Sequence, residues 1–369
     1  MVMSSNETEL TLPDGAWFRR LRRKVSAWFS GHARDLPWRK TTDPYAIWVS
    51  EVMLQQTQVA TVIPYHARFL AAFPSIAALA AADEEAVLRL WEGLGYYRRA
   101  RQLHQAAKKI VADHSGEFPR DYDAVRQLPG IGRYTAGAIL SIAFDQSLPI
   151  LEANTSRLFA RLLAFRGDIT SPGGTRLLWS FAEAIVPRRG AGRLNQAVME
   201  LGSLICVPKS PRCDVCPAAA LCRARIENAQ NEIPRSKAKP VFIACREAVV
   251  LVRRRGEVLL CRQQEGERWA GLWDFPRFPA EGPDSPTMRE NLSEAVRART
   301  GVAISIDSHA GTLRHGVTRY RITLDSYHAR PSGGRIRDPE NTRWVALAEL
   351  DRYPLSATGR KLAGRLVDQ

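Results

Sequence analysis

Four cysteines in the second half of the chain have the spacing of ligands to a metal centre. Cys206, Cys213, Cys216 and Cys222 are separated by six, two and five residues. Thiolates bind both iron–sulfur clusters and structural zinc ions. Zinc sites made of four cysteines tend to use two Cys-x2-Cys pairs, and this segment contains only one. The spacing therefore favours a 4Fe-4S cluster, with a zinc site or reduced thiols without metal as the alternatives.

Two further features could contact phosphates. Lys209 and Arg212 lie inside the first loop of the cysteine segment, where a rigid loop would hold both cations at a nucleic-acid backbone. Residues 128–136 (LPGIGRYTA) join two helical patterns through Gly130 and Gly132. Small residues allow close backbone approach, and the N-terminus of the following helix offers free N–H groups to an anion. The segment predicts a helix-hairpin-helix contact with DNA, or else an ordinary turn between helices.

The overall charge agrees with a polyanionic partner. Fifty-three Lys and Arg residues against 38 Asp and Glu give a net charge of +15, which favours nucleic acid ahead of a membrane surface. No apolar run reaches the ~18 residues of a membrane helix, and the N-terminus lacks the apolar core of a signal peptide. These features predict a cytoplasmic protein with no membrane partner, in a compartment that keeps thiols reduced, although charge alone does not choose between DNA, RNA and the ribosome. We further expect a DNA-associated monomer.

The elements that must position these residues change in character along the chain. Residues 16–227 have apolar positions at three- and four-residue spacing, which predicts a mainly α region. The polar, basic segment 228–240 contains two prolines and predicts an exposed linker. Residues 241–369 combine strand-like runs with one helical stretch that stops at Gly301. The expected fold is a helical N-terminal domain followed by a smaller α+β domain.

Several motifs together resemble one known family. The hairpin sequence LPGIG, the cysteine spacing and residues 50–59 (SEVMLQQTQV) are similar to the MutY adenine DNA glycosylases of the endonuclease III, or helix-hairpin-helix, superfamily. The resemblance covers essentially the whole chain. It implies a 4Fe-4S cluster and a base-excision-repair enzyme that flips adenine out of double-stranded DNA. The implied reaction hydrolyses the N-glycosidic bond of adenine mispaired with 8-oxoguanine or guanine.

The resemblance also implies catalytic roles. Breaking this bond requires a proton for the departing base and a negative charge near the cationic sugar. The family match makes Glu51 the acid and Tyr134 the assistant at the sugar, at a position where bifunctional relatives carry lysine. Without that amine no Schiff base forms, so we expect a monofunctional enzyme. Glu152 and Asn154 match the residues that stabilise the sugar cation, but Glu152-Ala153 replaces the family's Asp-Gly.

Base flipping requires a binding pocket and side chains that enter the vacated stack. The resemblance implies these roles for six residues, some of which have ordinary positions in a core or on a helix surface as alternatives. The implied adenine-pocket residues are Trp38, Arg39, Leu54 and Gln196, and those implied to insert around the lesion pair are Gln56 and Tyr96.

The C-terminal run 269–276 (WAGLWDFP) resembles the MutY C-terminal domain, which is similar to Nudix hydrolases. A Nudix metal site needs paired glutamates that fall here at Ala298 and Arg299, so we expect a recognition domain without hydrolase activity. In its implied 8-oxoguanine loop, Thr318 keeps a hydroxyl, and Arg319 replaces the family's histidine. These departures and Glu152-Ala153 leave two alternatives: a catalytically weakened lesion-binding protein, or a glycosylase of altered specificity.

Overall fold

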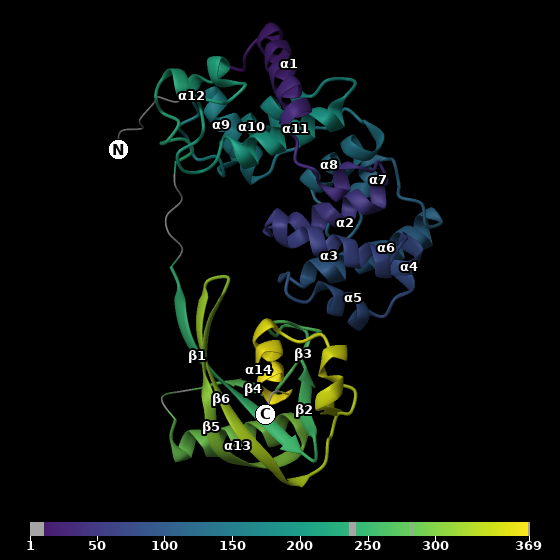
Figure 1. The fold of residues 1–369 in the computed structure, drawn as a ribbon, viewed down its shortest axis with the longest axis vertical. Helices are drawn as coiled ribbons and strands as arrows, with labels where there is room; N and C mark the ends of the chain where they lie inside the picture. Colours follow the sequence, from purple (N-terminus) through teal and green to yellow (C-terminus); the bar gives the residue numbers. More distant parts are fainter. Residues whose placement is uncertain (1–10, 236–240, 281, 283, 368–369) are drawn as a thin grey trace. The chain divides into compact units, whose positions relative to one another are not determined.

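The computed structural model describes residues 11–235, 241–280, 282 and 284–367. Its residues gather into two compact units. One falls within Met1–Ala81 and Gln102–Ala238, and the other within Ala82–Arg101 and Lys239–Gln369. Figure 1 shows that the first is helical and that a sheet dominates the second. The predicted fold class, a mainly α region with a smaller α+β domain, is confirmed.

Helices make up almost all the regular structure of the first unit. Helix α6 (Arg98–His114) crosses the division between the units, and α5 (Glu84–Trp91) belongs to the second. The other helices and short 3-10 turns are α1 (Gly15–His32), η1 (Pro37–Arg39), α2 (Pro44–Leu54), α3 (Val59–Ala72), α4 (Ile76–Ala81), α7 (Tyr122–Arg126), α8 (Arg133–Phe144), α9 (Ala153–Leu163), α10 (Pro172–Ile185), α11 (Ala191–Leu204), η2 (Ala219–Leu221) and α12 (Arg223–Ile226).

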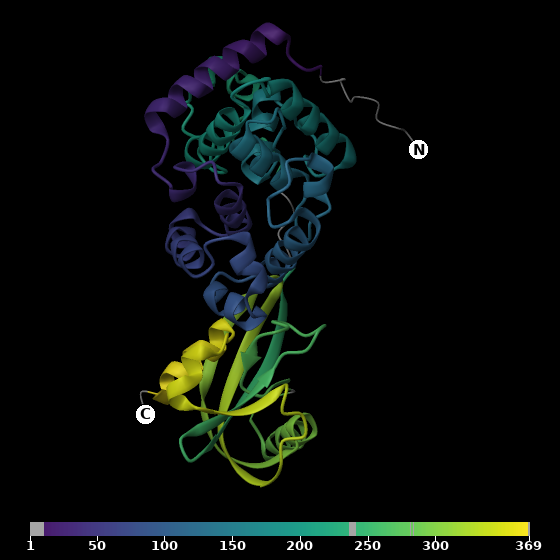
Figure 2. The same ribbon diagram turned by 90° about the vertical axis from the view of Figure 1, so that its right-hand side faces the viewer.

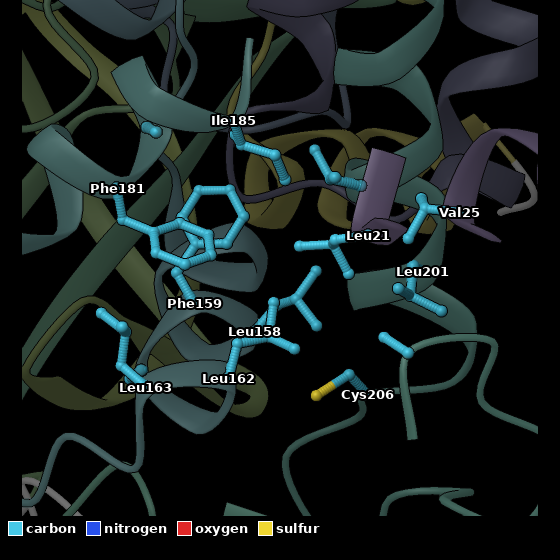
Figure 3. Close-up of a cluster of buried hydrophobic side chains, with 14 of the residues drawn as sticks. Leu21, Val25, Leu158, Phe159, Leu162, Leu163, Phe181, Ile185, Leu201 and Cys206 are labelled. Atoms are coloured by element: carbon cyan, nitrogen blue, oxygen red, sulfur yellow. The ribbon is translucent and has the colours of Figure 1, made fainter. Parts of the chain in front are cut away.

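The main core of this unit lies where helices α1, α9, α10 and α11 meet. Apolar residues at helical spacing, such as Leu21 and Val25 of α1, point from each helix into the cluster. Figure 3 shows these side chains together with Cys206, whose side chain is buried in the same cluster. The first cysteine of the metal-ligand segment is therefore anchored in the hydrophobic core.

The prediction that residues 228–240 are an exposed linker is wrong for part of that segment. Ala229 and Ile233 are each 2% exposed and belong to the core of the first unit. Their small and apolar side chains fill space left beside α9 and α12, which the polar residues around them obscure in the sequence. Residues 236–240 lie outside the described residues.

The predicted hairpin joins α7 to α8 and depends on glycine at Gly130. That residue has φ +78°, and a Cβ atom there would lie 2.9 Å from the Cβ of Gln102. Gly132 follows as the N-cap of α8, with no side-chain hydrogen bond at that cap. The hairpin thus turns tightly and ends at the N–H groups of α8, as the sequence predicted.

The second unit is built on a mixed sheet with the strand order β3-β2-β1-β6-β5, to which β4 and β7 add by pairing with β1 and β2. Its elements are β1 (Ile243–Arg254), β2 (Glu257–Arg262), β3 (Trp273–Asp274), β4 (Arg277–Pro279), α13 (Pro286–Thr300), β5 (Val302–Val317), β6 (Tyr320–Gly334), β7 (Thr342–Ala346), η3 (Leu347–Arg352) and α14 (Ala357–Val367).

Alternation along β1 places the two longer helices of this unit on opposite faces of the sheet. Val249 packs with Leu362 of α14, whereas its neighbour Val250 packs with Val296 of α13. Figure 2 shows α13 and α14 on either side of the strands. Helix α13 ends at Gly301, which has φ +83°, as predicted. Among the described residues no helix is long and apolar enough to cross a membrane.

Candidate active site

A pocket of about 460 Å³ opens in the first unit, and the residues predicted to act in catalysis line it. Its walls come from η1, α2, α8, α11 and the N-terminus of α9. All eight residues that the sequence assigned to catalysis or to the adenine pocket line it. They are Trp38, Arg39, Glu51, Leu54, Tyr134, Glu152, Asn154 and Gln196. Residues from both halves of the helical unit therefore meet at one cavity.

Glu51 is held in the pocket wall by the way α2 is built. Asp43 caps the helix by accepting from the backbone N–H groups of Tyr45 and Ala46, and Pro44 occupies the first turn. The helix is buried on nearly every side, and Glu51 itself is only 3% exposed. The Tyr134 hydroxyl donates to Glu51 Oε2 over 2.7 Å. The two predicted catalytic groups are thus in direct contact.

The electrostatics of this pair suit an acid. Burial, supplemented by the nearby charge of Glu152, raises the pKa of Glu51 from about 4.5 to about 7, although the Tyr134 hydrogen bond and Arg39 act in the opposite direction. Burial and the neighbouring Glu51 also raise the pKa of Tyr134 well above its usual value. Near neutral pH, a large fraction of Glu51 therefore carries a proton while Tyr134 remains a hydroxyl donor.

Glu152 lies at the N-cap of α9, where its longer side chain folds back onto its own helix. Its Oε1 accepts the N–H of Thr155 at 2.8 Å, and its Oε2 accepts the N–H of Asn154 at 2.8 Å. The Thr155 hydroxyl returns the contact by accepting the N–H of Glu152, which completes a capping box. Glutamate is one methylene longer than aspartate, and at the pocket edge this longer side chain folds back to form the capping box.

Asn154 is fixed between this carboxylate and a buried arginine. Its Nδ2 donates to Glu152 Oε2 over 3.2 Å, and its Oδ1 accepts from Arg157 over 2.9 Å. Arg157 also donates to the carbonyl of Cys206 over 2.7 Å. The amide orientation therefore depends on hydrogen bonds that reach from the pocket to the cysteine segment.

Sequence reasoning missed a buried ion pair in the same pocket. The side chain of Glu200 on α11 is fully buried, and both Arg34 and Arg39 donate to its carboxylate, at 2.6 and 2.8 Å. Burial alone would raise the pKa of Glu200, but the two arginines outweigh it and lower that pKa to about 2. The pair fixes the guanidinium of Arg39 beside the pocket. One signal was available: Glu200 follows the predicted Gln196 by one helical turn on the same face.

The four cysteines line a second, smaller cavity of the first unit beside α9. Arg161 of α9 is 2% exposed and donates to Cys206 Sγ over 3.2 Å. The same guanidinium donates to four backbone carbonyls, those of Cys206, Val207, Pro208 and Ile233. Within the described ranges, no three His, Cys, Asp or Glu side chains are grouped in a way that would hold a metal ion. The thiols thus share a cavity that a buried cation braces.

The remaining predicted residues of the first unit lie outside the pocket lining. Gln56 is exposed in the turn between α2 and α3 with φ +58°. Positive φ is costly for a non-glycine residue and is concentrated at functional sites. Gly130 and Gly132 form the hairpin, and Lys209 and Arg212 are exposed in the first loop of the cysteine segment.

Three predicted residues belong to the second unit. Tyr96 has φ +50° and a side chain that is 48% exposed. The expected 8-oxoguanine loop is the tip of a β-hairpin: Thr318, with φ +50°, and Arg319 are exposed in the turn between β5 and β6. At the position of a Nudix glutamate, Arg299 of α13 forms an ion pair with Glu267 at 2.6 Å.

Comparison with known proteins gives the site its context. Residues 49–183 match the family described as HhH-GPD superfamily base excision DNA repair protein, and residues 248–364 match the NUDIX domain. Among solved structures, a thermostable thymine-DNA glycosylase superposes with a TM-score of 0.53 at 26% identity, covering 57% of this chain and 98% of that one. Endonuclease III from a DNA complex, at 22% identity and a TM-score of 0.51, shares the fold over 59% of this chain and 99% of its own.

Curated relatives extend the similarity to both units. The adenine DNA glycosylase of Rattus norvegicus is 33% identical over 92% of this chain and 77% of its own length. That of Homo sapiens is 31% identical over 95% and 74%, and that of Schizosaccharomyces pombe is 37% identical over 93% and 88%. Together with the buried Glu51–Tyr134 pair on a helix-hairpin-helix scaffold, these matches show that the chain is an enzyme of the adenine DNA glycosylase family, the MutY branch of the HhH-GPD base-excision-repair superfamily.

Proposed function

We propose that this glycosylase hydrolyses the N-glycosidic bond of adenine paired with 8-oxoguanine or guanine in double-stranded DNA and leaves an abasic site. The observation that carries the proposal is the Glu51–Tyr134 hydrogen bond in a buried pocket, where the pKa of Glu51 is about 7. A carboxyl group with such a pKa can both deliver and recover a proton near neutral pH.

In the proposed mechanism, Glu51 protonates N7 of the flipped adenine, so that the base departs as a neutral molecule. The Tyr134 hydroxyl occupies Glu51 Oε2, which leaves the other carboxyl oxygen to carry the proton. As the bond breaks, positive charge develops on the sugar, and the carboxylate of Glu152 with the amide oxygen of Asn154 stabilises it. Glu51, now ionised, then accepts a proton from the attacking water.

The pocket also supports a monofunctional reaction. None of its lining residues is a lysine, and Tyr134 occupies the position where an amine would act. Strand cleavage through a Schiff base requires such an amine. We therefore propose that the product keeps an intact DNA backbone until a second activity cleaves it.

The residues outside the pocket suit DNA engagement in this proposal. Gln56 and Tyr96 would enter the stack around the flipped base, and the exposed cations Lys209 and Arg212 would contact phosphates. Residues 16–227 would form the glycosylase domain, which acts as a monomer on DNA in the cytoplasm. Residues 241–369 would form a recognition domain that meets 8-oxoguanine with Thr318 and Arg319, the two residues at the exposed tip of the β5–β6 hairpin.

We propose a 4Fe-4S cluster for the cavity beside α9, because four thiols line it, although the described side chains there are not grouped as metal ligands. Cys206, Cys213, Cys216 and Cys222 would be its ligands, and the Arg161 N–H that reaches Cys206 Sγ is the kind of hydrogen bond that thiolate ligands accept. When bound, such a cluster would supply a rigid cross-link of the loop. For the reaction itself, the loop would hold Lys209 and Arg212 in position, and its Cys206 carbonyl would accept the hydrogen bond of the arginine that orients Asn154.

The test is single-turnover cleavage of duplexes that contain adenine opposite 8-oxoguanine or guanine. Alkali treatment reveals abasic sites, and the parent is compared with Glu51→Gln. We expect adenine release by the parent and none by the variant, with no strand cleavage before alkali. A Glu232→Gln variant, which changes an exposed carboxyl group outside the pocket, serves as the control.

The Glu152 arrangement favours a second candidate, a lesion-binding protein with weakened catalysis. Its carboxylate accepts three hydrogen bonds from its own helix terminus, which reduces the negative charge it presents to a sugar cation. Tight binding of the adenine:8-oxoguanine duplex without release, together with activity gained in the double variant Glu152→Asp/Ala153→Gly, would favour this candidate.

A further inference from the structure

The second unit exposes an apolar surface at one end of its sheet that the proposed mechanism does not use. Three consecutive apolar residues, Val241, Phe242 and Ile243, are 85%, 48% and 41% exposed. Folded proteins rarely leave a continuous run of large apolar side chains in water without a binding role. In the second unit, the only other exposed large apolar residues in the described part are Tyr96 and Val367.

This surface continues onto the tip of the β5–β6 hairpin. Ile243 pairs with Tyr320 in the parallel β1–β6 ladder, and its N–H donates to the carbonyl of Arg319 over 2.8 Å. Figure 1 shows β1 running alongside the hairpin to this end of the sheet. The exposed run and the hairpin tip therefore form one surface, which we call the tip patch: Val241, Phe242, Ile243, Arg319, Tyr320 and Arg321.

The aromatic rings of the tip patch are paired with cations. The guanidinium carbon of Arg321 lies 3.7 Å from the centroid of Phe242. Those of Arg268 and Arg319 lie 4.7 and 5.4 Å from the centroid of Tyr320. Such pairs give a stiff surface that presents both ring and guanidinium planes.

The charge of this surface is uncompensated. Arg268 is neutralised by Glu247 at 2.6 Å, whereas among the described residues neither Arg319 nor Arg321 has a carboxylate within ion-pair distance. A site for an acidic ligand without apolar character would not expose Phe242 and Ile243. Aromatic rings paired with guanidinium groups that carry free positive charge instead match a nucleic-acid strand, which offers both phosphates and base or sugar faces.

Gly316 of β5 explains how Arg321 reaches Phe242. A Cβ atom at position 316 would collide with the guanidinium of Arg321. Gly316 and Arg321 are cross-strand partners in the β5–β6 ladder, so the bare backbone lets the arginine lie flat across the hairpin. Gly316 thus leaves room for the guanidinium of Arg321 beside Phe242.

We propose that the tip patch is a DNA-strand contact in which Arg321 binds a phosphate and Phe242 packs against the adjacent nucleotide. The inference rests on the proposed function, because it takes duplex DNA as the ligand, but it assigns residues beyond the Thr318–Arg319 tip. The contact does not depend on the damaged base. It therefore strengthens binding to damaged and undamaged duplexes alike.

The test measures equilibrium binding of the full-length chain, in a Glu51→Gln background, to a duplex with adenine opposite 8-oxoguanine and to the undamaged duplex. For Arg321→Gln we expect the slope of log K against log salt to become shallower by about 0.9 on both duplexes, the value for one lost phosphate contact. For Phe242→Ala we expect about tenfold weaker binding with an unchanged slope, as for a lost stacking contact, and Phe242→Tyr should restore the affinity.

The matched control is Arg255→Gln. Arg255 is exposed and follows the opposite end of β1, so this variant removes the same charge from the same sheet. Its slope and affinity should equal those of the parent. The proposal is overturned if Arg321→Gln keeps the parental slope or if Phe242→Ala binds as tightly as the parent. Because undamaged DNA reports the contact, a chain that binds in this way but releases no adenine would refute the proposed function and leave the patch standing.

Discussion

The raised pKa of Glu51 predicts an effect on folding stability that can be measured separately from its role in catalysis. A carboxyl group whose pKa is higher in the folded than in the unfolded chain favours folding when it is protonated. Glu51 has a folded pKa of about 7 and an ordinary value of 4.5, so below pH 4.5 it does not destabilise the folded chain. The cost grows as the pH rises from 4.5 to 7 and is constant above that. Stability is therefore lost, not gained, as Glu51 ionises.

The magnitude follows from the shift. A rise of about 2.5 pKa units corresponds to about 3 kcal/mol at 1.36 kcal/mol per unit. Glu51→Gln keeps the size of the side chain and an oxygen that can accept from Tyr134, but it cannot ionise. We expect the variant to be about 3 kcal/mol more stable relative to the parent at pH 8 than at pH 4, while it loses adenine release.

Urea unfolding followed by tryptophan fluorescence, at pH values from 4 to 8.5, measures the difference between the two chains. Taking the difference cancels ionisations that both share. The parental single-turnover rate should also fall as the pH rises through 7, since only protonated Glu51 can deliver a proton. A difference in unfolding free energy that is flat across this range would show that Glu51 is not held neutral by burial, and the argument for its acid role would fail.

Three further predictions concern the pocket around Glu51 and the cavity of the four cysteines. Tyr134→Phe removes the hydrogen bond that lowers the pKa of Glu51, so the alkaline limb of the rate profile should move to higher pH; an unmoved limb would contradict the contact. Glu200→Gln leaves two arginines without their buried counter-charge and should cost about 3 kcal/mol of unfolding free energy in urea titrations. Arg161→Met should lose iron to a chelator faster than the parent, as measured by the decay of the cluster's visible absorbance. The control Arg166→Met changes an exposed arginine and should lose iron at the parental rate.

Much of the pocket could be predicted through the resemblance of its motifs to a known family, whereas local signals only place those residues on helices. Asp43-Pro44 predicts the start of α2, and Glu51 and Leu54 follow on that helix. The Arg34–Glu200 pair could not be found in this way. Its partners are 166 residues apart, and a charged residue on a helix is usually read as solvent-exposed. Arg161 was missed for the same reason, although it is 2% exposed.

The β structure was less readable than the helices. Strand β5 was not predicted, because a strand is recognised by regular alternation and β5 has register shifts at three places along its pairing with β6. Each bulge moves the following residues to the other face. Because β5 was not predicted, the expected 8-oxoguanine loop around Thr318 was not recognised as the turn of a long β5–β6 hairpin. Tertiary pairing, which local sequence does not encode, decides this part of the fold.

Helix α9 relates the two sites of the first unit. Its N-terminus is capped by Glu152 at the pocket, and about one and a half and two and a half turns later Arg157 and Arg161 donate to the backbone and sulfur of Cys206. Because a helix is stiff over this length, a loop that moves away at Cys206 removes one of the two backbone hydrogen bonds that orient Arg157, the other being to the carbonyl of Gly202, and so affects the amide of Asn154. The cysteine segment, although it contributes no atom to the pocket lining, is therefore part of what keeps the proposed charge-stabilising amide of Asn154 in place.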